Sequence, residues 1–367
     1  MRTFSGPGYA VRVRTAAEGR AVLFPSMGEY RGAYDDGVYD GFAAEDDRRR
    51  AYRLALMGAA PGRVVADIGT GRDALWAIEA ARSGARHVYA IEADAAAAAQ
   101  AERAVARAGL AGWVTVIEGD STRVRLPERA EVCVSEIVGN IASAEGAIAV
   151  LADARERLCT PDCAWIPLRM QTWTMAVDLP GEHAVATASL PYLSSVFASV
   201  GRPFDLRLCV AGPLAEAGRS GAAAVESLVF ASRRAAPEPS ASTSVDLRAT
   251  AAGRVTGLVL WTRVAASSHT PEIDALSGLT RGWAPVYVPV SLPGLPVRAG
   301  DRLRVDFARR TSDDGIHPDY AVTVEMPSGS ATWSSPHHGR AFRGSAFYRH
   351  LFPPPAGNAD ARKGTPS

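Results

Sequence analysis

Between residues 64 and 158, short apolar runs alternate with stretches of helical periodicity, and this alternation constrains the fold more than any other feature of the chain. The pattern predicts strands over 64–68, 87–91, 114–117 and 132–135, and helices over 74–83, 95–108 and 147–158. Strands and helices in alternation are typical of a parallel sheet that is covered by helices on both faces. We therefore expect an α/β domain in this part of the chain.

The sequence changes character after residue 167, where helical periodicity fades and short β-branched or aromatic runs take over. These runs predict strands over 171–177, 206–210, 227–232, 257–264, 286–290, 302–307 and 321–325. Many strands without helices between them favour an antiparallel sandwich or barrel. The polar and proline-rich segments 234–244 and 267–271 are predicted as loops.

The N-terminal part shows two weaker patterns. Alternation over residues 9–24 predicts a hairpin with strands 9–14 and 21–24, and helical periodicity begins at about residue 43 and runs to about 57. The tail from about residue 353 is rich in proline and polar residues, and we expect it to be disordered.

Composition and charge give no support to a nucleic-acid or a membrane partner. A chain of 367 residues suits two domains, and the net charge of +1, from 40 basic and 39 acidic residues, gives no support for a nucleic-acid partner. No apolar stretch approaches the roughly 20 residues that span a bilayer, and the N-terminus lacks the apolar region of a signal peptide. We therefore expect a cytoplasmic protein without a membrane partner.

Neither the cysteines nor the histidines show the spacing of a metal site. The cysteines form no C-x-x-C pair, so we expect reduced, mostly buried thiols without a disulfide framework or zinc. The cysteines are Cys133, Cys159, Cys163 and Cys209. Three histidines lie in polar segments without a partner at ligand spacing, and we predict surface positions for them and no metal ligand. These are His317, His337 and His338.

The first predicted strand ends in a glycine turn that opens a helix. Gly69 and Gly71 allow the backbone to approach a ligand, and the N-terminus of the following helix offers unpaired N–H groups. Dinucleotide-binding folds and methyltransferases both use such a turn, and both of their patterns have a third glycine that is missing here. Asp67 ends the strand and is expected to order the turn rather than to touch a cofactor directly.

Acidic residues follow the next two predicted strands. Glu92 ends the second strand, about twenty residues after the turn, where an acid can accept hydrogen bonds from both ribose hydroxyls. Asp120 follows the third strand, where it can accept from an adenine amino group. Because the carboxyl ends of parallel strands lie at one edge of a sheet, the three strand ends together predict a nucleoside-type cofactor site.

Two further acids, Glu136 and Glu145, lie nine residues apart just after the fourth predicted strand. Alone they would be ordinary loop acids. At the mouth of a cofactor site, two carboxylates can hold a cationic nitrogen substrate.

In these features the stretch from about residue 30 to 174 resembles the catalytic half of the protein arginine methyltransferase family. The segment 84–92 is similar to the family's sequence after the glycine turn, and Ser135-Glu136 with Glu145 matches its double-glutamate hairpin. Tyr30 and Tyr34, and then Asp46 and Arg49, lie near its N-terminal tyrosines and its helical Asp-x-x-Arg. In the second half, 255–261 resembles a strand of the family's barrel, and Trp283 lies where its Thr-His-Trp loop would fall, with Gly282 in place of the histidine.

The resemblance implies a Rossmann-like domain that binds S-adenosyl-L-methionine, followed by a β-barrel or sandwich domain. It implies that Glu136 and Glu145 hold the substrate and that Arg49 pairs with the cofactor's carboxylate. Tyr34 would line the methyl channel and Trp283 would wall the substrate pocket, although both are equally compatible with simple packing. The cofactor-binding set is Arg49, Asp67, Gly69, Gly71, Glu92 and Asp120.

These implications divide the chain into four parts: an N-terminal hairpin and helical segment (1–62), the cofactor domain (63–166), the substrate and dimerisation domain (167–350) and the tail (351–367). Family members dimerise through an arm on the barrel domain, for which 190–197 is a candidate, although its apolar residues fit an ordinary helix as well.

The expected function is methyl transfer to a cationic guanidino or amino nitrogen of a protein, a peptide or a small molecule. Methylation of a hydroxyl or a nucleic acid, and a non-catalytic partner subunit, are the alternatives. The presence of both glutamates disfavours a non-catalytic subunit. It also favours a cationic substrate over another acceptor, because a neutral hydroxyl gains nothing from two anions. Departures at Asp73, Thr122, Ala43, Ala44 and Gly282 indicate a divergent member.

Overall fold

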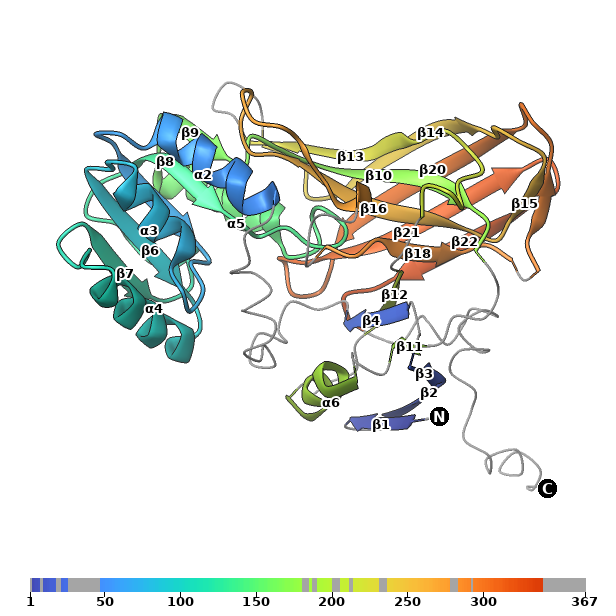
Figure 1. The fold of residues 1–367 in the computed structure, drawn as a ribbon, viewed down its shortest axis with the longest axis horizontal. Helices are drawn as coiled ribbons and strands as arrows, with labels where there is room; N and C mark the ends of the chain where they lie inside the picture. The colour runs from blue at the N-terminus through green and yellow to red at the C-terminus, as the bar shows by residue number, and fades with distance from the viewer. Residues whose placement is uncertain are drawn as a thin grey trace, which may run out of the picture.

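The computed structural model describes residues 2–6, 9–17, 21–25, 47–179, 185–186, 190–199, 205–210, 214–230, 236–277, 283–291 and 293–338. Figure 1 shows a helix-covered sheet at one end of the molecule and long antiparallel strands at the other. The predictions for Tyr30, Tyr34, Asp46, Gly282 and the tail lie outside the described residues.

The predicted α/β part of the chain contains a five-stranded sheet in the order β7-β6-β5-β8-β9. Its strands are β5 (Val64–Ile68), β6 (His87–Glu92), β7 (Val114–Glu118), β8 (Ala130–Ser135) and β9 (Cys159–Ile166), and all neighbours are parallel. The predicted α/β domain is thereby confirmed. The pattern did not predict β9, whose Thr160-Pro161-Asp162 interrupts the apolar run.

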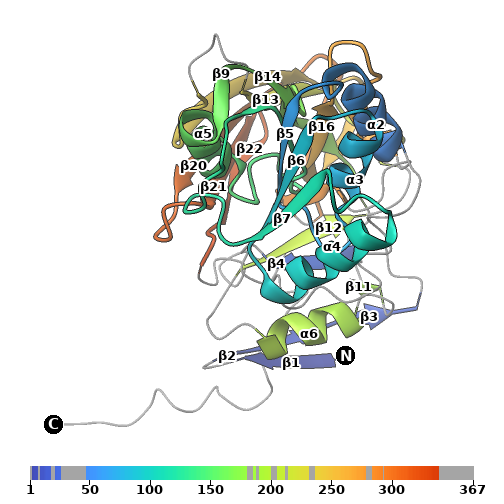
Figure 2. The same ribbon diagram turned by 90° about the vertical axis from the view of Figure 1, so that its left-hand side faces the viewer.

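Four helices cover this sheet: α2 (Asp47–Ala59), α3 (Leu75–Arg82), α4 (Ala95–Arg107) and α5 (Ala147–Arg157). Figure 2 shows α2, α3 and α4 on one side of the sheet and α5 on the other. The alanine-rich start of α4 is capped by Asp94, whose carboxylate accepts from the Ala97 N–H at 2.7 Å. Tyr52 of α2 stacks on Trp76 of α3 with ring centroids 4.6 Å apart, and its hydroxyl donates to the Ser135 carbonyl of β8 at 3.3 Å, which joins α2 to both α3 and the sheet.

The second half is confirmed as mainly antiparallel and mostly consists of two sheets, with parallel pairing only where the short β11 meets β3 and β4 within the described residues. The larger sheet runs β13-β10-β16-β18-β12-β4-β11-β3, and the smaller runs β14-β20-β21-β22. The larger contains β10 (Arg169–Val177), β12 (Leu206–Val210), β13 (Ala223–Val229), β16 (Gly257–Ala265), β18 (Val286–Pro289) and the short β3 (Thr15–Ala16), β4 (Ala21–Pro25), β11 (Val185–Ala186) and β17 (Ile273–Asp274). The smaller contains β14 (Ala241–Arg248), β20 (Arg302–Thr311), β21 (Pro318–Met326) and β22 (Gly329–Ser335). A short pair joins β15 (Gly253–Val255) to β19 (Leu295–Val297).

Within the described ranges these strands do not close into one barrel, so of the two predicted forms the layered sandwich is the nearer description. The centre of β16 is fully buried at Leu258, Val259, Leu260 and Trp261. This strand is the core of the second half.

Two local predictions are wrong. The strand β2 (Tyr9–Val13) pairs with β1 (Arg2–Gly6), whereas β4 pairs with the distant β12, so no hairpin joins residues 9–14 to 21–24. Alternation alone does not say which neighbour a strand will choose. Residues 241–244 were predicted as a loop, but they begin β14. The sequence did not reveal this strand because its exposed residues are mostly serine and threonine, which give no apolar pattern.

The candidate dimerisation arm forms helix α6 (Leu190–Ser199). Its Leu193, Val196 and Phe197 are buried, and the Phe197 ring lies 5.7 Å from that of Phe4 in β1. These apolar residues pack within the chain, which favours the ordinary-helix alternative.

Candidate active site

The glycine turn after β5 is tied to the acid at the end of β6. Gly69 and Gly71 have φ values of +75° and +66°, a conformation that residues with a Cβ rarely adopt. The Glu92 carboxylate accepts from the Gly71 N–H at 2.9 Å with one oxygen and from the Asp94 N–H at 2.9 Å with the other. The structure therefore brings together the turn and the predicted ribose acid.

Asp67 lies beneath this turn and is fully buried. Its carboxylate accepts from the Thr70 hydroxyl at 2.5 Å. Burial raises the pKa of Asp67 to about 7, which the hydrogen bond from Thr70 opposes and the nearby carboxylates of Glu92 and Glu136 reinforce. A carboxyl in this position is a turn-ordering group whose charge changes near neutral pH.

Asp120 follows β7 on the same edge of the sheet. One of its oxygens accepts from both the N–H and the hydroxyl of Thr122, at 2.9 and 2.8 Å. The side chain is half-buried and orders its own loop. Thr122, one of the departures from the family pattern, is thus the residue that orients this acid.

Glu136, directly after β8, is held by two side chains from the helices that cover the sheet. One carboxylate oxygen accepts from Arg48 Nη1 at 2.6 Å, and the other accepts from Trp76 Nε1 at 3.0 Å. The Arg48 side chain is fully buried, whereas that of Glu136 keeps 16% of its surface exposed. A carboxylate at this strand end therefore holds a guanidinium in a largely water-free setting.

Arg49, which the sequence analysis assigned to the cofactor, has different surroundings. Its Nη2 lies 3.5 Å from Glu79 Oε1 on α3, and its side chain is 23% exposed. Sequence reasoning missed Arg48, although it shares the buried face of α2 with Tyr52, four residues on. That spacing is the signal that could have selected it.

The loop that carries both glutamates is anchored to the second half of the chain. The Ala142 N–H donates to Thr172 Oγ1 at 3.0 Å, and Ser143 Oγ donates to Glu226 Oε1 at 2.7 Å. Glu226 also accepts from Thr172 and from Arg309 at 2.7 and 3.0 Å. This buried network links β10, β13 and β20 to the loop.

Glu145 lies at the far end of this loop and is half-buried. The loop folds back on itself, so that its two ends come close together. A Cβ placed on Gly139 would lie only 2.8 Å from Ala144 Cβ and 3.5 Å from Glu145 Cγ. Glycine at 139 therefore allows the close approach that brings Glu145 back toward the start of the loop.

Trp283 is buried and lies near the same arginine. The guanidinium carbon of Arg48 is 6.0 Å from its ring centroid, and the adjacent Ala284 carbonyl accepts from Asn140 Nδ2 at 2.6 Å. The structure thus places Trp283 beside both Arg48 and the loop between the glutamates.

The surface prediction for two histidines is wrong. His317 and His337 are buried, and His338 is half-buried. The connection between β20 and β21 folds against Gly146, and the chain after β22 returns to it, so residues that are polar in sequence are enclosed. The four cysteines are free and buried as expected.

Comparison with solved structures identifies the fold. The crystal structure of Arabidopsis thaliana protein arginine methyltransferase 10 matches 83% of this chain and 98% of its own, with a TM-score of 0.67 and 19% identity. The Trypanosoma brucei PRMT1 enzyme–prozyme complex with AdoHcy matches 79% of this chain and 94% of its own, with a TM-score of 0.61 and 19% identity. The chain therefore has the fold of the protein arginine methyltransferases.

Sequence comparison identifies the family. No family model matches the chain. The arginine N(omega)-methyltransferase of Streptomyces achromogenes subsp. streptozoticus is 30% identical over 293 residues, which cover 73% of this chain and 76% of that protein. The protein arginine N-methyltransferase PRMT10 of Oryza sativa subsp. japonica is 40% identical over 130 residues, and this match spans only 33% of its length. The chain belongs to the arginine N-methyltransferase family.

The helices in the described part of the chain all lack the length and apolar character of a membrane-spanning segment.

Proposed function

We propose that the protein is an S-adenosyl-L-methionine-dependent N-methyltransferase that acts on the guanidino nitrogen of arginine. The observation that carries this proposal is the contact between Glu136 and the buried guanidinium of Arg48 at 2.6 Å. It supports the view that the first glutamate of the loop suits a guanidinium in low-dielectric surroundings.

The residues along the sheet edge fit the proposed cofactor. Glu92 has two carboxylate oxygens beside the glycine turn, which suit a ribose diol, and Asp120 suits an adenine amino group. A guanidinium has five N–H donors, so Arg48 can hold Glu136 and a ligand carboxylate together. When bound, the cofactor supplies an electrophilic methyl group on a sulfonium.

Arg48 is therefore our first candidate for the cofactor's carboxylate, and Arg49 the second. Arg48 lies beside Glu136 and near Trp283, whereas Arg49 faces Glu79 on α3. Tyr34 remains a predicted wall of the methyl channel and Trp283 of the substrate pocket.

The two glutamates would solve an electrostatic problem. A sulfonium and a guanidinium at 4 Å repel by about 4 kcal/mol at an effective dielectric near 20. Two carboxylates offset this repulsion and fix the guanidinium plane, so that one nitrogen faces the methyl carbon. The bound cofactor would supply its methyl group to this nitrogen, and the methylated guanidinium would lose one proton to a carboxylate or to water.

Arginine itself is the first acceptor to test. The Streptomyces relative, of which the match covers 76%, is named for arginine, whereas the match to the rice protein named for protein arginine spans a third of that protein. Arginine within a peptide or protein is the second candidate.

We also propose a homodimer in the cytoplasm. Leu54 and Met57 on the outer face of α2 are 47% and 56% exposed, and a second copy of the chain would cover them. The free cysteines support a reducing compartment.

Light scattering should report a dimer for the wild type and a monomer for the double variant Leu54→Glu/Met57→Glu. The exposed Trp113 gives the control, Trp113→Glu. A wild-type monomer would contradict this assignment.

Mass spectrometry with a cofactor that carries a labelled methyl group tests the function. L-Arginine or an arginine peptide should gain a label on a guanidino nitrogen, whereas lysine and serine peptides should not. Label on a hydroxyl, or on no acceptor despite cofactor binding, would favour the alternatives of another acceptor or a partner subunit.

A further inference from the structure

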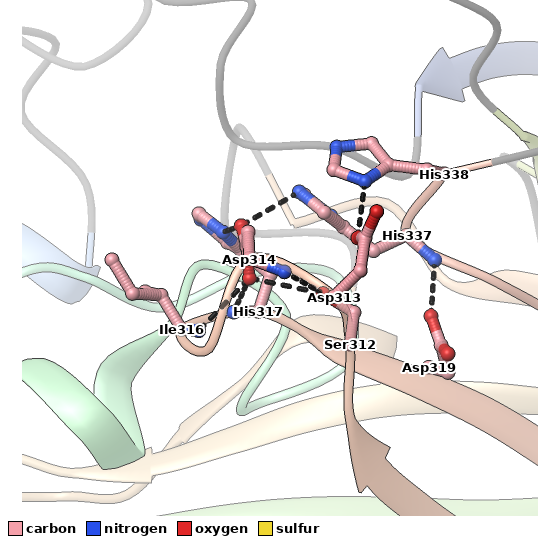
Figure 3. Close-up of polar contacts among 8 residues, drawn as sticks. All are labelled: Ser312, Asp313, Asp314, Ile316, His317, Asp319, His337 and His338. Atoms are coloured by element: carbon pink, nitrogen blue, oxygen red, sulfur yellow. Dashed lines mark hydrogen bonds and ion pairs between the residues drawn. The ribbon is translucent and has the colours of Figure 1, made fainter.

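A cluster of one carboxylate and two imidazoles lies outside the candidate active site. Asp314 and His317 belong to the connection between β20 and β21, and His337 follows β22 (Figure 3). Asp314 Oδ2 lies 2.5 Å from His317 Nδ1 and 3.2 Å from His337 Nε2. Both histidine side chains are buried, at 7% and 0% exposure, and that of Asp314 keeps only 15%.

Backbone contacts hold this cluster in place. Asp314 Oδ1 accepts from the N–H groups of Ile316 and His317, each at 2.8 Å, so the loop closes on its own carboxylate. The His337 N–H donates to Asp319 Oδ1 at 2.7 Å. The imidazoles of His317 and His337 stack with centroids 4.3 Å apart and an angle of 6° between their planes. Three side chains from two distant segments are therefore positioned before any ligand arrives.

We propose that Asp314, His317 and His337 form a binding site for a divalent transition-metal ion, with Zn²⁺ as the best fit. One ligand atom from each residue lies within 4.8 Å of the others. Two imidazole nitrogens with one carboxylate are a ligand set of zinc sites, at metal–ligand distances of about 2.0–2.2 Å. The ion would take the place of the proton between Asp314 Oδ2 and His317 Nδ1, and His337 Nε2, which lies 3.2 Å from the same oxygen, would join the coordination shell. A water molecule completes four-fold coordination.

The charges around the cluster suit a cation. The backbone N–H groups of Ile316 and His317 both donate to Asp314 Oδ1, and such donors favour the charged form of a carboxylate, which is the form that binds a metal ion. Asp313, which pairs with His338 at 2.5 Å, and Asp319 add negative charge next to the site (Figure 3).

The position of the cluster gives a bound ion a structural role. A Cβ on Gly146 would lie 2.6 Å from Ile316 Cγ2 and 3.5 Å from His317 Nε2, so the loop packs directly on the residue after Glu145. A metal ion that joins this loop to His337 would stiffen the Glu145 end of the double-glutamate loop. This consequence rests on the proposed function, whereas metal binding itself does not.

Zinc titration of the full chain tests the proposal. The protein is prepared without a histidine tag, stripped with EDTA and titrated with ZnCl₂ by calorimetry and thermal unfolding. We expect one ion per chain and a Tm rise of about 3 °C or more at saturation. His337→Asn and Asp314→Asn should each weaken zinc binding at least about tenfold. His269→Gln, at an exposed histidine remote in sequence, is the control and should bind as the wild type does.

The proposal would be overturned if the stripped wild type bound no zinc, or if the wild type and both variants bound zinc equally well. Circular dichroism of the metal-free variants checks that they fold. If a variant unfolds, the absorption spectrum of the wild type with Co²⁺ decides the matter, because imidazole and carboxylate ligands give weak d–d bands whereas thiolates add intense charge-transfer absorption. A thiolate spectrum would place the ion at the cysteines and contradict the proposal. Since no assay of methyl transfer is involved, failure here leaves the proposed function standing.

Discussion

The two ends of the double-glutamate loop are held by different halves of the molecule. Glu136 contacts Arg48 and Trp76 of the helices on the parallel sheet. The Glu145 end packs through Gly146 on the β20–β21 connection of the antiparallel half, and Ser143 between them bonds Glu226. The relative position of the two carboxylates therefore depends on how the two halves dock.

The largest effect is expected from a substitution that disrupts the buried network between the two halves. Glu226 is buried and accepts from Ser143, Thr172 and Arg309, so Glu226→Leu leaves the Arg309 guanidinium without its carboxylate. We expect the free energy of unfolding to fall by about 3–5 kcal/mol in urea titrations. The exposed pair Arg302–Asp246 provides the control, and Asp246→Asn should cost less than about 1 kcal/mol. Similar losses in both variants would show that the buried network does not hold the halves together.

The second prediction compares the two glutamates directly. Glu136→Gln and Glu145→Gln should each lower kcat by about 100-fold or more, because each removes a charge that offsets the repulsion between the two cations. Glu145→Gln should leave cofactor affinity within about twofold, whereas Glu136→Gln should weaken it moderately through Arg48. Calorimetry and turnover assays measure both quantities. Unchanged turnover in both variants would contradict the proposal that the two glutamates hold the guanidinium.

A third prediction separates the neighbouring arginines. Arg48→Lys should weaken cofactor binding about tenfold or more, because an ammonium cannot bridge two carboxylates as a planar guanidinium does. Arg49→Lys should change it by less than about twofold, since Arg49 lies 3.5 Å from Glu79 and partly in solvent. Calorimetric titration with S-adenosylhomocysteine measures both, and the reverse order would restore Arg49 as the ligand.

The smallest expected effect concerns Asp67. Its pKa is about 7 in the folded protein and 3.8 as the ordinary value, so the folded state keeps a proton that the unfolded chain loses above pH 4. Stability contributed by the protonated carboxyl is therefore lost as the pH rises from about 4 to 7, and is constant above that range. Between pH 5 and 8 the wild type should lose at least about 1 kcal/mol more than Asp67→Asn, as urea titrations can measure. Equal losses would contradict the shifted pKa.

The two halves also differ in how well their strands could be predicted from the sequence. Strands β5 to β8 were predictable because each is a short apolar run in a repeated local pattern, whereas β4 pairs with β12 some 180 residues later, which no local pattern reveals. Arg48 was readable from its helical spacing to Tyr52 but lay among three consecutive arginines. His317 and His337 are twenty residues apart, and only the β21–β22 hairpin brings them together.

A comparison of arginine binding with citrulline binding tests most directly whether the protein holds a guanidinium with two carboxylates. Citrulline has the same shape, but a neutral urea group replaces the guanidinium. With S-adenosylhomocysteine present, calorimetry should show that arginine, free or within a short peptide, binds the wild type at least about tenfold more tightly than its citrulline counterpart. This preference should disappear in Glu136→Gln/Glu145→Gln. Equal binding of the two ligands by the wild type would contradict the assignment of Glu136 and Glu145 as the residues that hold a guanidinium.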